Sequence, residues 1–311
     1  MENLPLVVSK EKTIREKKFN FDRLFLLLMI SPAAIILLIF TAFPIINLLN
    51  LMLSKVELSD ATFSIEFTGF ENISRLLTDA AFFSSMGKTL VYMVGSVGGE
   101  VILGTALALL VSQGLKVSGP FRAILLLPMV ISPVAVGLIW RLMYNPEFGL
   151  FNAVLKGMGL PTVGWLSDPN VAMASIILSD IWQWTAFVYL IVIAGLESLP
   201  KDPLEAADVD GASAWQKFWQ VTLPMLAPTL IVAVMFRAMD ALKAFDKFVV
   251  LTSGGPGDAT EIASLYAYKV TFRYWEIGYG SLMSFILVVL GALISWGLNR
   301  VIYKKVGGSN E

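Results

Sequence analysis

The sequence contains no cysteine and no histidine. Without cysteine the chain forms no disulfide and offers no thiolate nucleophile. Without histidine it lacks the side chain that proteins use most often as a general base near neutral pH and as a metal ligand. Charged residues are also scarce, at 15% of the chain, whereas soluble domains carry roughly 25%. An enzyme built from this sequence would depend on carboxylates, lysines and hydroxyls.

Apolar residues take the place of the missing charges. They make up 56% of the chain, and the mean hydropathy is +0.73. A soluble protein of this composition could not cover its surface with polar groups, so the sequence predicts a membrane protein. The net charge of −1 gives no support for binding nucleic acid. The first apolar run follows about twenty polar residues and exceeds the roughly 7–15 residues of a signal-peptide core, so it is expected to remain as a span.

Six apolar runs are long enough to cross a bilayer, which takes about 20 residues in a helix. They cover residues 24–54, 89–113, 123–140, 170–196, 224–251 and 277–299. The sequence therefore predicts an all-α integral membrane protein with six transmembrane helices and both termini on the same side. Most of the 23 lysines and arginines fall on that side, which the positive-inside rule makes cytoplasmic.

Three regions are expected along the chain. Residues 1–23 form a cytoplasmic N-terminal tail, residues 24–303 form the transmembrane domain, and residues 304–311 form a cytoplasmic C-terminal tail. Within the transmembrane domain, the charged and amphipathic segment 197–222 is a cytoplasmic loop. The polar segments 55–85, 144–169 and 252–276 are expected to lie outside the membrane on the opposite side.

The segment 197–222 predicts two short helices joined by a turn. Asp202, Pro203 and Glu205 have the spacing of a capping box with proline at the first helical position. Gly211 suits the left-handed conformation that often ends a helix. Ser213 and the glutamine three residues later form a second box. The fifth span is expected to start afterwards, with proline in its first turn.

Aromatic residues occupy one side of the second predicted helix, at Trp215, Phe218 and Trp219. Exposed aromatics on a folded loop indicate a docking surface. Packing of the loop against its own membrane helices would explain the same pattern equally well.

The motif E-A-A-x-x-D-G-A at residues 205–212, followed by Leu223 and Pro224, resembles the EAA loop of ABC importer permeases. The runs at 121–155 and 245–256 are similar to segments of the carbohydrate permeases of maltose type. The resemblance covers roughly residues 20–305 and implies the type I ABC importer permease fold. It also implies that the loop is a coupling helix that sits in a groove of an ATPase subunit, with the motif residues Glu205, Ala206, Ala207, Asp210 and Gly211 in contact.

Maltose-type permeases bind sugar with the helices before and after this loop. The resemblance therefore places substrate-pathway candidates at Gln183, Trp184, Phe187, Arg237, Asp240, Ala241 and Ala244. Most of these residue types differ from the maltose pattern, so the sugar stays open. Arg237 and Lys243 would suit an acidic sugar, such as a uronate oligosaccharide, or a phosphorylated polyol such as glycerol phosphate.

Five charges lie in the fifth apolar run, at Arg237, Asp240, Lys243, Asp246 and Lys247. Charges at membrane depth are costly and often functional. They could line a sugar path as a polar stripe. The favoured interpretation is internal salt bridges at a helix or subunit interface, and the spacing allows Lys243 to pair with Asp240 or with Asp246.

Two further acidic residues lie inside apolar runs. Asp180 stands beside Trp182 and Trp184, a combination that suits either a sugar site or an aromatic belt at the membrane interface. Glu100 stands alone in the second run. We expect it to hydrogen-bond to another subunit rather than to touch substrate.

The sequence has no G-x-x-x-x-G-K-[ST] motif, so ATP must be hydrolysed by another chain. The resemblance implies a non-catalytic transport subunit without catalytic residues, metal site or cofactor of its own, while a partner ATPase dimer uses ATP-Mg. The other implied partners are a second permease subunit forming a heterodimer, an extracytoplasmic solute-binding protein, a carbohydrate and membrane lipid. The expected location is the bacterial or archaeal cytoplasmic membrane, crossed several times.

Two functions from other classes compete with this interpretation. A secondary transporter would move substrate without an ATPase, but it has no need of a two-helix cytoplasmic loop with this motif. A membrane-embedded enzyme would need paired catalytic groups at one depth, and neither histidine nor cysteine is available for them.

Overall fold

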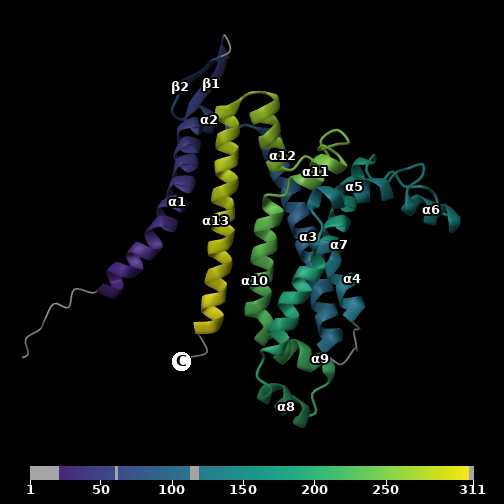
Figure 1. The fold of residues 1–311 in the computed structure, drawn as a ribbon. Helices are drawn as coiled ribbons and strands as arrows, with labels where there is room; N and C mark the ends of the chain where they lie inside the picture. The colour runs from purple at the N-terminus through teal and green to yellow at the C-terminus, as the bar shows by residue number, and fades with distance from the viewer. Residues whose placement is uncertain (1–20, 60–61, 113–118, 308–311) are drawn as a thin grey trace, which may run out of the picture. The chain divides into compact units, whose positions relative to one another are not determined.

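The computed structural model describes residues 21–59, 62–112 and 119–307, which are mainly helical (Figure 1). Residues up to Asn47 form one compact unit, and residues from Leu48 onward form another. The elements, in chain order, are α1 (Phe21–Met52), β1 (Ser54–Ser59), β2 (Thr62–Phe67), α2 (Glu71–Leu76), α3 (Ala80–Ser112), α4 (Gly119–Val130), α5 (Pro133–Met143), α6 (Leu150–Gly157), α7 (Pro169–Glu197), α8 (Asp202–Val209), α9 (Ala214–Lys217), the π-helix η1 (Phe218–Thr222), α10 (Leu223–Leu242), α11 (Asp246–Leu251), α12 (Ala263–Tyr268), the π-helix η2 (Lys269–Arg273) and α13 (Ile277–Gly307).

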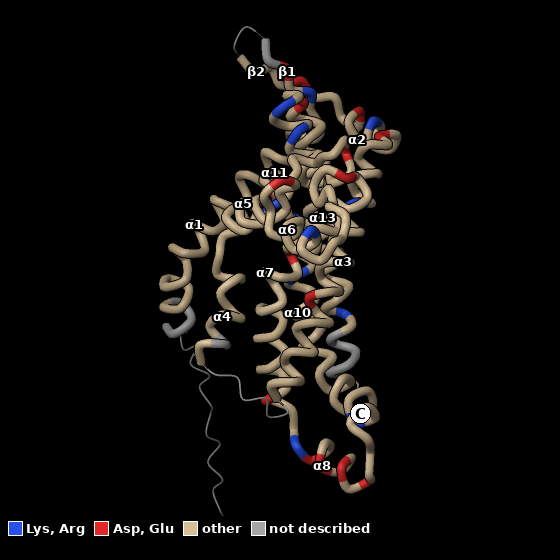
Figure 2. Tube along the Cα trace, turned by 90° about the vertical axis from the view of Figure 1, so that its right-hand side faces the viewer, with Lys and Arg blue, Asp and Glu red and all other residues tan. Residues whose placement is uncertain are grey.

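Five helices are long and apolar enough to cross a membrane within the described ranges. They cover Phe25–Met52, Ala80–Ser112, Pro169–Glu197, Ala214–Leu242 and Ile277–Val301. Figure 2 shows that charged residues gather near β1, β2 and α2 and again around α8, with long uncharged stretches between these two ends. Most of the predicted N-terminal tail and its basic residues lie outside the described part, as does Lys116. The orientation of the spans therefore stays a prediction.

The predicted third span is not a straight helix. Its two halves, Ala123–Val130 and Pro133–Met143, meet at an angle of 106°. The break falls at Ser132-Pro133, because proline has no amide hydrogen and disfavours helical geometry in the residue before it. Ser132 caps α5 by accepting a hydrogen bond from the Ala135 amide. The Gln183 amide donates to the carbonyl of Ile131, 2.9 Å away, and so satisfies a group that the break leaves free.

The predicted loop at 144–169 contains the helix α6, which the sequence interpretation missed. Asn152 fixes the chain that follows it: its Oδ1 accepts bonds from the Val163 amide at 3.0 Å and the Trp165 indole at 3.1 Å. Tyr144 stacks on both Phe151 and Trp165. These contacts hold α6 against the end of α5 and explain why a segment rich in glycine and proline is still ordered.

The expectation of an all-α protein is wrong in one place, because β1 and β2 form an antiparallel β-hairpin. Val56 pairs with Ile65, and Ser54 pairs with Phe67. The apolar residues of this segment alternate with polar ones, which is the period of a strand. The side chain of Asn72 fixes the base of the β-hairpin by donating to the carbonyls of Met52 and Ser54, at 3.0 and 3.1 Å.

The helices α3 and α7 pack closely because glycines lie between them. A Cβ on Gly99 would come within 2.4 Å of the Ile181 side chain. A Cβ on Gly104 would lie 2.8 Å from Val188 Cβ and 3.0 Å from the Tyr189 nitrogen. In membranes small residues allow this approach, and dispersion contacts between the backbones then stabilise the pair.

At the β-hairpin end of these helices, Asp79 joins three elements. Its Oδ1 accepts a bond from the Phe82 amide in the first turn of α3, at 3.0 Å. Its Oδ2 accepts bonds from the hydroxyls of Tyr279 at 2.6 Å and Tyr266 at 3.2 Å. Burial raises the pKa of this carboxyl, but the hydrogen bonds from Tyr279, Phe82 and Tyr266 outweigh burial and hold the pKa below its usual value.

Asp79→Asn is expected to lower the unfolding temperature near neutral pH and to weaken its dependence on acid. The lowered pKa means that ionised Asp79 stabilises the fold above the unfolded value of about 3.9, and that this contribution is lost as pH falls through the lower folded value. Thermal unfolding of the detergent-solubilised protein between pH 3 and pH 7 measures this. The same acid dependence in both proteins would contradict the assigned role of Asp79.

Candidate functional site

Two regions of the chain are candidates for function, and the first is the α8–α9 loop, residues 197–222. Its two helices lie beyond the ends of α7 and α10 (Figure 1). Gly211 has φ of 74°, so the predicted left-handed turn is confirmed. The predicted capping box of Ser213 and Gln216 is confirmed by both of its hydrogen bonds.

Two details of the α8–α9 loop differ from the prediction. Asp202 is already inside α8, Lys201 precedes it, and no side chain caps the helix, so the predicted first capping box is absent. Proline and Glu205 in the first turn suffice to begin the helix there. The second helix is also not separate: α9 has four residues and continues through η1 into α10. The fifth span thus begins at Ala214.

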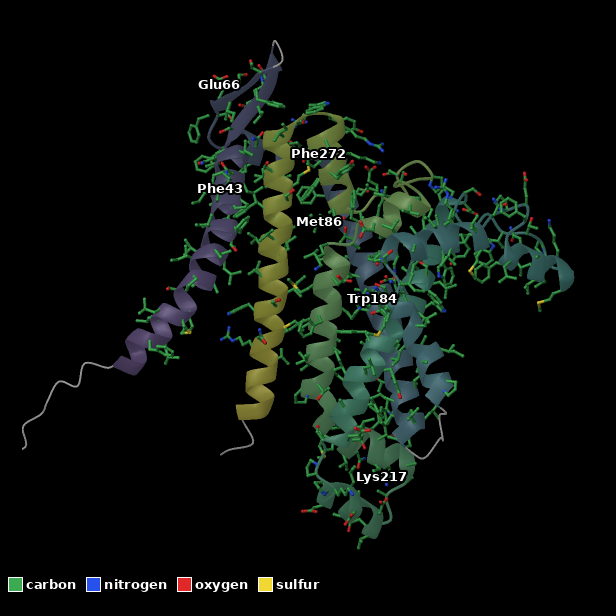
Figure 3. All side chains as sticks on the ribbon, viewed as in Figure 1. Phe43, Glu66, Met86, Trp184, Lys217 and Phe272 are labelled. Carbon is green, nitrogen blue, oxygen red and sulfur yellow. The ribbon has the colours of Figure 1, made fainter. Side chains whose placement is uncertain are left out.

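The predicted coupling residues lie mainly on the open face of α8. Glu205, Ala206, Asp210 and Gly211 are exposed, whereas Ala207 is buried. Val209 stands among them and is 88% exposed, which is unusual for an apolar side chain on a short charged helix. An ion pair of 2.6 Å between Lys217 and Asp208 ties α9 to α8. Figure 3 shows Lys217 at the end of the long helices where α8 and α9 lie.

The aromatic residues of the α8–α9 loop lie beside another helix of the same chain, and two of them are exposed. Trp215, Phe218 and Trp219 contact one another and, together with α3, line an apolar pocket of about 610 Å³. Trp215 and Trp219 remain exposed. They therefore pack beside a neighbouring helix of the same chain and still present apolar surface.

The second region is a group of charges in the interior, where four buried side chains from α3, α7, α10 and α11 meet. They are Glu100, Asp180, Arg237 and Lys247. Their formal charges cancel, which is a condition for burying charge at acceptable cost. We call these four residues the ion cluster.

Arg237 is the centre of the ion cluster and is 2% exposed. Its Nε and Nη2 donate to the two oxygens of Glu100, at 2.6 and 3.0 Å. Nη2 also donates to Asp180 at 2.9 Å, and Nη1 donates to Asp240 at 2.6 Å. Lys247 donates to the other oxygen of Asp180. The planar guanidinium suits this arrangement, because its donors fan out in fixed directions toward three carboxylates.

These contacts confirm the favoured interpretation, internal salt bridges at a helix interface, for Arg237. The expectation that Glu100 contacts another subunit is wrong, because Glu100 is 0% exposed within its own chain, where Arg237 donates to both of its oxygens. The pair between Asp240 and Lys243 is present at 3.7 Å. The predicted pair between Lys243 and Asp246 does not form in the part of the chain that the structure describes.

The pair between Lys243 and Asp246 does not form because the fifth apolar run does not continue as one helix. The helix α10 ends at Leu242, and α11 begins at Asp246 after a break. The Ser264 hydroxyl donates to the Ala244 carbonyl, which the break leaves without a helical partner. The break lets Lys247 reach Asp180 on α7 instead of following Lys243 along one helix face.

A polar pocket of about 300 Å³ lies beside the ion cluster. It is lined by Tyr92, Pro133, Asp180, Trp184, Asp240, Lys243, Ala244, Phe245, Asp246 and Lys247. The Arg237 guanidinium lies over the Trp184 ring, 4.6 Å from its centre. Figure 3 shows Trp184 about midway along the long helices, so this pocket is at membrane depth.

Three of the seven substrate-pathway candidates line this pocket: Trp184, Asp240 and Ala244. The other four do not line it. Gln183 donates to the carbonyl at the break after α4, and Ala241 is buried in the core. Phe187 contacts Phe236 of α10, and Arg237 is buried and donates to Asp240.

Sequence reasoning did not identify Tyr92, Pro133 and Phe245 as pocket residues, whereas Asp246 was among the charges that could line a sugar path. Phe245 lies in the break between α10 and α11, and a break inside an apolar run with several charges could have indicated it. No pattern in the sequence around Tyr92 indicates a pocket residue, because Tyr92 lies on α3, far along the chain from the other residues that line the pocket.

Comparison with known proteins places the chain in a family. A family model described as "Binding-protein-dependent transport system inner membrane component" matches residues 100–308. The chain belongs to this family. The permease has no group of three or more acidic residues that could hold a metal ion within the described ranges.

Relatives of known name match almost the whole permease. The trehalose/maltose transport system permease protein MalF of Thermococcus litoralis is 39% identical over 94% of this chain and 95% of its own. The sulfoquinovosyl glycerol transport system permease protein SmoG of Agrobacterium fabrum is 34% identical over 91% of this chain and 92% of its own.

A solved structure has the same fold. A chain of a bacterial alginate ABC transporter, crystallised with an alginate pentasaccharide-bound periplasmic protein, superposes with a TM-score of 0.76 at 23% identity. The match covers 92% of this permease and 96% of that chain. The family model and the named relatives, together with this shared fold, confirm the predicted resemblance to ABC importer permeases.

Proposed function

We propose that this permease is the membrane-spanning subunit of an ATP-driven importer for a carbohydrate, which a solute-binding protein delivers and which crosses by alternating access. The names of relatives that transport trehalose, maltose or a sulfoquinovosyl glycerol support a carbohydrate as substrate. The permease is not an enzyme and binds no cofactor, because ATP-Mg is used by a dimer of separate ATPase subunits. A second, different permease subunit completes the pathway in the cytoplasmic membrane of a bacterium or archaeon.

The observation that carries this proposal is the open face of α8. A short charged helix exposes Glu205, Ala206 and the apolar Val209, while Ala207 and the ion pair between Lys217 and Asp208 fix it to the chain. Burying an exposed apolar side chain such as Val209 against a partner would stabilise a complex. The sequence has no nucleotide-binding motif of its own, so an ATPase is the partner that this surface suits.

The proposal is tested by co-expressing the permease with its genomic neighbours and measuring how much ATPase co-purifies. Val209→Glu is expected to reduce the bound ATPase by about tenfold or more, because it places a charge in a buried contact. Gly211→Pro is expected to do the same, because proline cannot adopt a φ of 74°.

Two variants serve as controls. Gly211→Asn keeps the turn, since asparagine tolerates the left-handed region and no atom lies within 4 Å of the added Cβ. Lys156→Gln lies far away on α6, exposed. Both are expected to bind ATPase like wild type. If all variants insert and retain the ATPase, the coupling role of α8 is refuted. Substrate uptake without any ATPase would favour a secondary transporter.

A further inference from the structure

The pocket beside the ion cluster has a charge balance that bears on what it can bind. Arg237, whose positive charge suggested an acidic substrate, is 2% exposed and already donates to Glu100, Asp180 and Asp240. Lys247 is buried and donates to Asp180. Of the three cations at or next to the pocket, two are therefore already paired with carboxylates of the protein.

The groups that remain open to the pocket are mainly acceptors. Asp240 is half-exposed, with a side chain that is 44% accessible, and only one of its oxygens is held by Arg237. Asp246 is exposed and makes no ion pair among the described residues. Lys243, 76% accessible, is the one open cation of the wall, and its contact with Asp240 is long at 3.7 Å. Two carboxylates thus face the pocket with one ammonium.

Carboxylates accept hydrogen bonds and donate none when ionised. Sugar hydroxyls can donate to them, and these charge-assisted bonds are the stronger kind. The same wall contains the rings of Tyr92, Trp184 and Phe245, which offer flat apolar surface to the C–H faces of a sugar ring. A carboxylate or phosphate on the substrate would instead meet two like charges and only one open cation.

We propose that this pocket selects an uncharged polyhydroxylated substrate, with Asp240 and Asp246 accepting its hydroxyls, and that it disfavours uronates, sulfonates and phosphorylated polyols. The proposal rests on the proposed import function and narrows its substrate class. It also reverses the sequence-based suggestion of an acidic sugar, because Arg237 is paired with the carboxylates of the ion cluster and does not line the pocket.

The test uses the complete importer, purified with its co-expressed partners and reconstituted in vesicles loaded with ATP. The vesicles receive one equimolar mixture of trehalose, maltose, lactose, trehalose 6-phosphate, digalacturonate and glycerol 3-phosphate. Mass spectrometry of the vesicle contents then identifies what has entered. Only neutral sugars are expected inside, and the entry of an anionic compound as the main product would overturn the proposal.

Charge variants separate the pocket from the binding protein as the source of this selection. Asp246→Lys is expected to reduce neutral-sugar import by about tenfold or more and to raise the anionic share, because it reverses the balance of open charges. Lys243→Gln is expected to lower import less than threefold. Import that collapses in Lys243→Gln, or that ignores Asp246→Lys, would refute the assignment.

The outcome also distinguishes this proposal from the function on which it rests. If the wild-type complex imports nothing from the mixture although ATPase is bound and Lys156→Gln behaves in the same way, the carbohydrate importer itself is refuted. If sugars enter but the selection is anionic, only the substrate class is wrong.

Discussion

Replacing Arg237 by methionine is expected to destabilise the permease by about 3–5 kcal/mol, because it leaves buried carboxylates without their partner. Glu100 uses both of its oxygens on Arg237, and Asp180 would lose one of its two cationic partners and keep Lys247. Methionine fills a similar length of space but can neither donate hydrogen bonds nor balance charge. Thermal or denaturant unfolding in detergent measures the loss, and we expect import to be abolished as well.

Two comparisons show whether burial is the cause. Lys55 and Glu57 form an ion pair of 2.7 Å on the surface, and Lys55→Met is expected to change the stability far less than Arg237→Met despite the similar length, because water screens an exposed pair. Adding Glu100→Gln to Arg237→Met removes the unpaired charge and should recover part of the loss. Equal effects of Lys55→Met and Arg237→Met would contradict the account of the ion cluster.

Gly104→Ala is expected to destabilise the fold by about 1–3 kcal/mol or more, since a single methyl group would force α3 and α7 apart. The new Cβ would lie 2.8 Å from Val188 Cβ and 3.0 Å from the backbone nitrogen of Tyr189. A flexible side chain could move aside, but the backbone nitrogen cannot. The unfolding temperature of the purified permease and its yield in membranes are the measurements.

Gly98→Ala is the matched control, on the same helix and less than two turns away. Nothing lies within 4 Å of its added Cβ. Alanine has a higher helix propensity than glycine by up to about 1 kcal/mol, so this variant should be as stable as wild type or more so. If both alanines destabilise alike, the close approach of α3 and α7 is not what Gly104 provides.

Features that depend on neighbouring residues could be predicted from the sequence. The long apolar runs predicted six spans, and five of them contain a helix long enough to cross a membrane, because the number of residues needed to cross a bilayer is fixed by helix geometry. Gly211 and the Ser213 capping box were also correct, since a turn and a cap involve groups three or four residues apart. The same local reasoning could have found the β-hairpin, whose alternating apolar and polar residues were interpreted only as part of a mixed polar segment outside the membrane.

The break after α4 had a local cause as well, in the Ser132-Pro133 pair. It was missed because an uncharged run of sufficient length looks like one span when only hydropathy is considered. The break after α10 has no proline beside it. It is stabilised by distant groups, the Ser264 hydroxyl and the Asp180 carboxylate.

The sequence by itself determined that this is a multi-span membrane protein of the importer family with a two-helix loop, because hydropathy, caps and the motif at 205–212 depend only on residues close together in the chain. Only the tertiary structure decided what the charges do. Glu100 and Arg237 are 137 positions apart, and no periodicity links them. Their pairing follows from how α3 and α10 pack, and it removes Arg237 from the pocket wall. The cost of burying an unpaired charge is the physical reason that the fold brings these residues together.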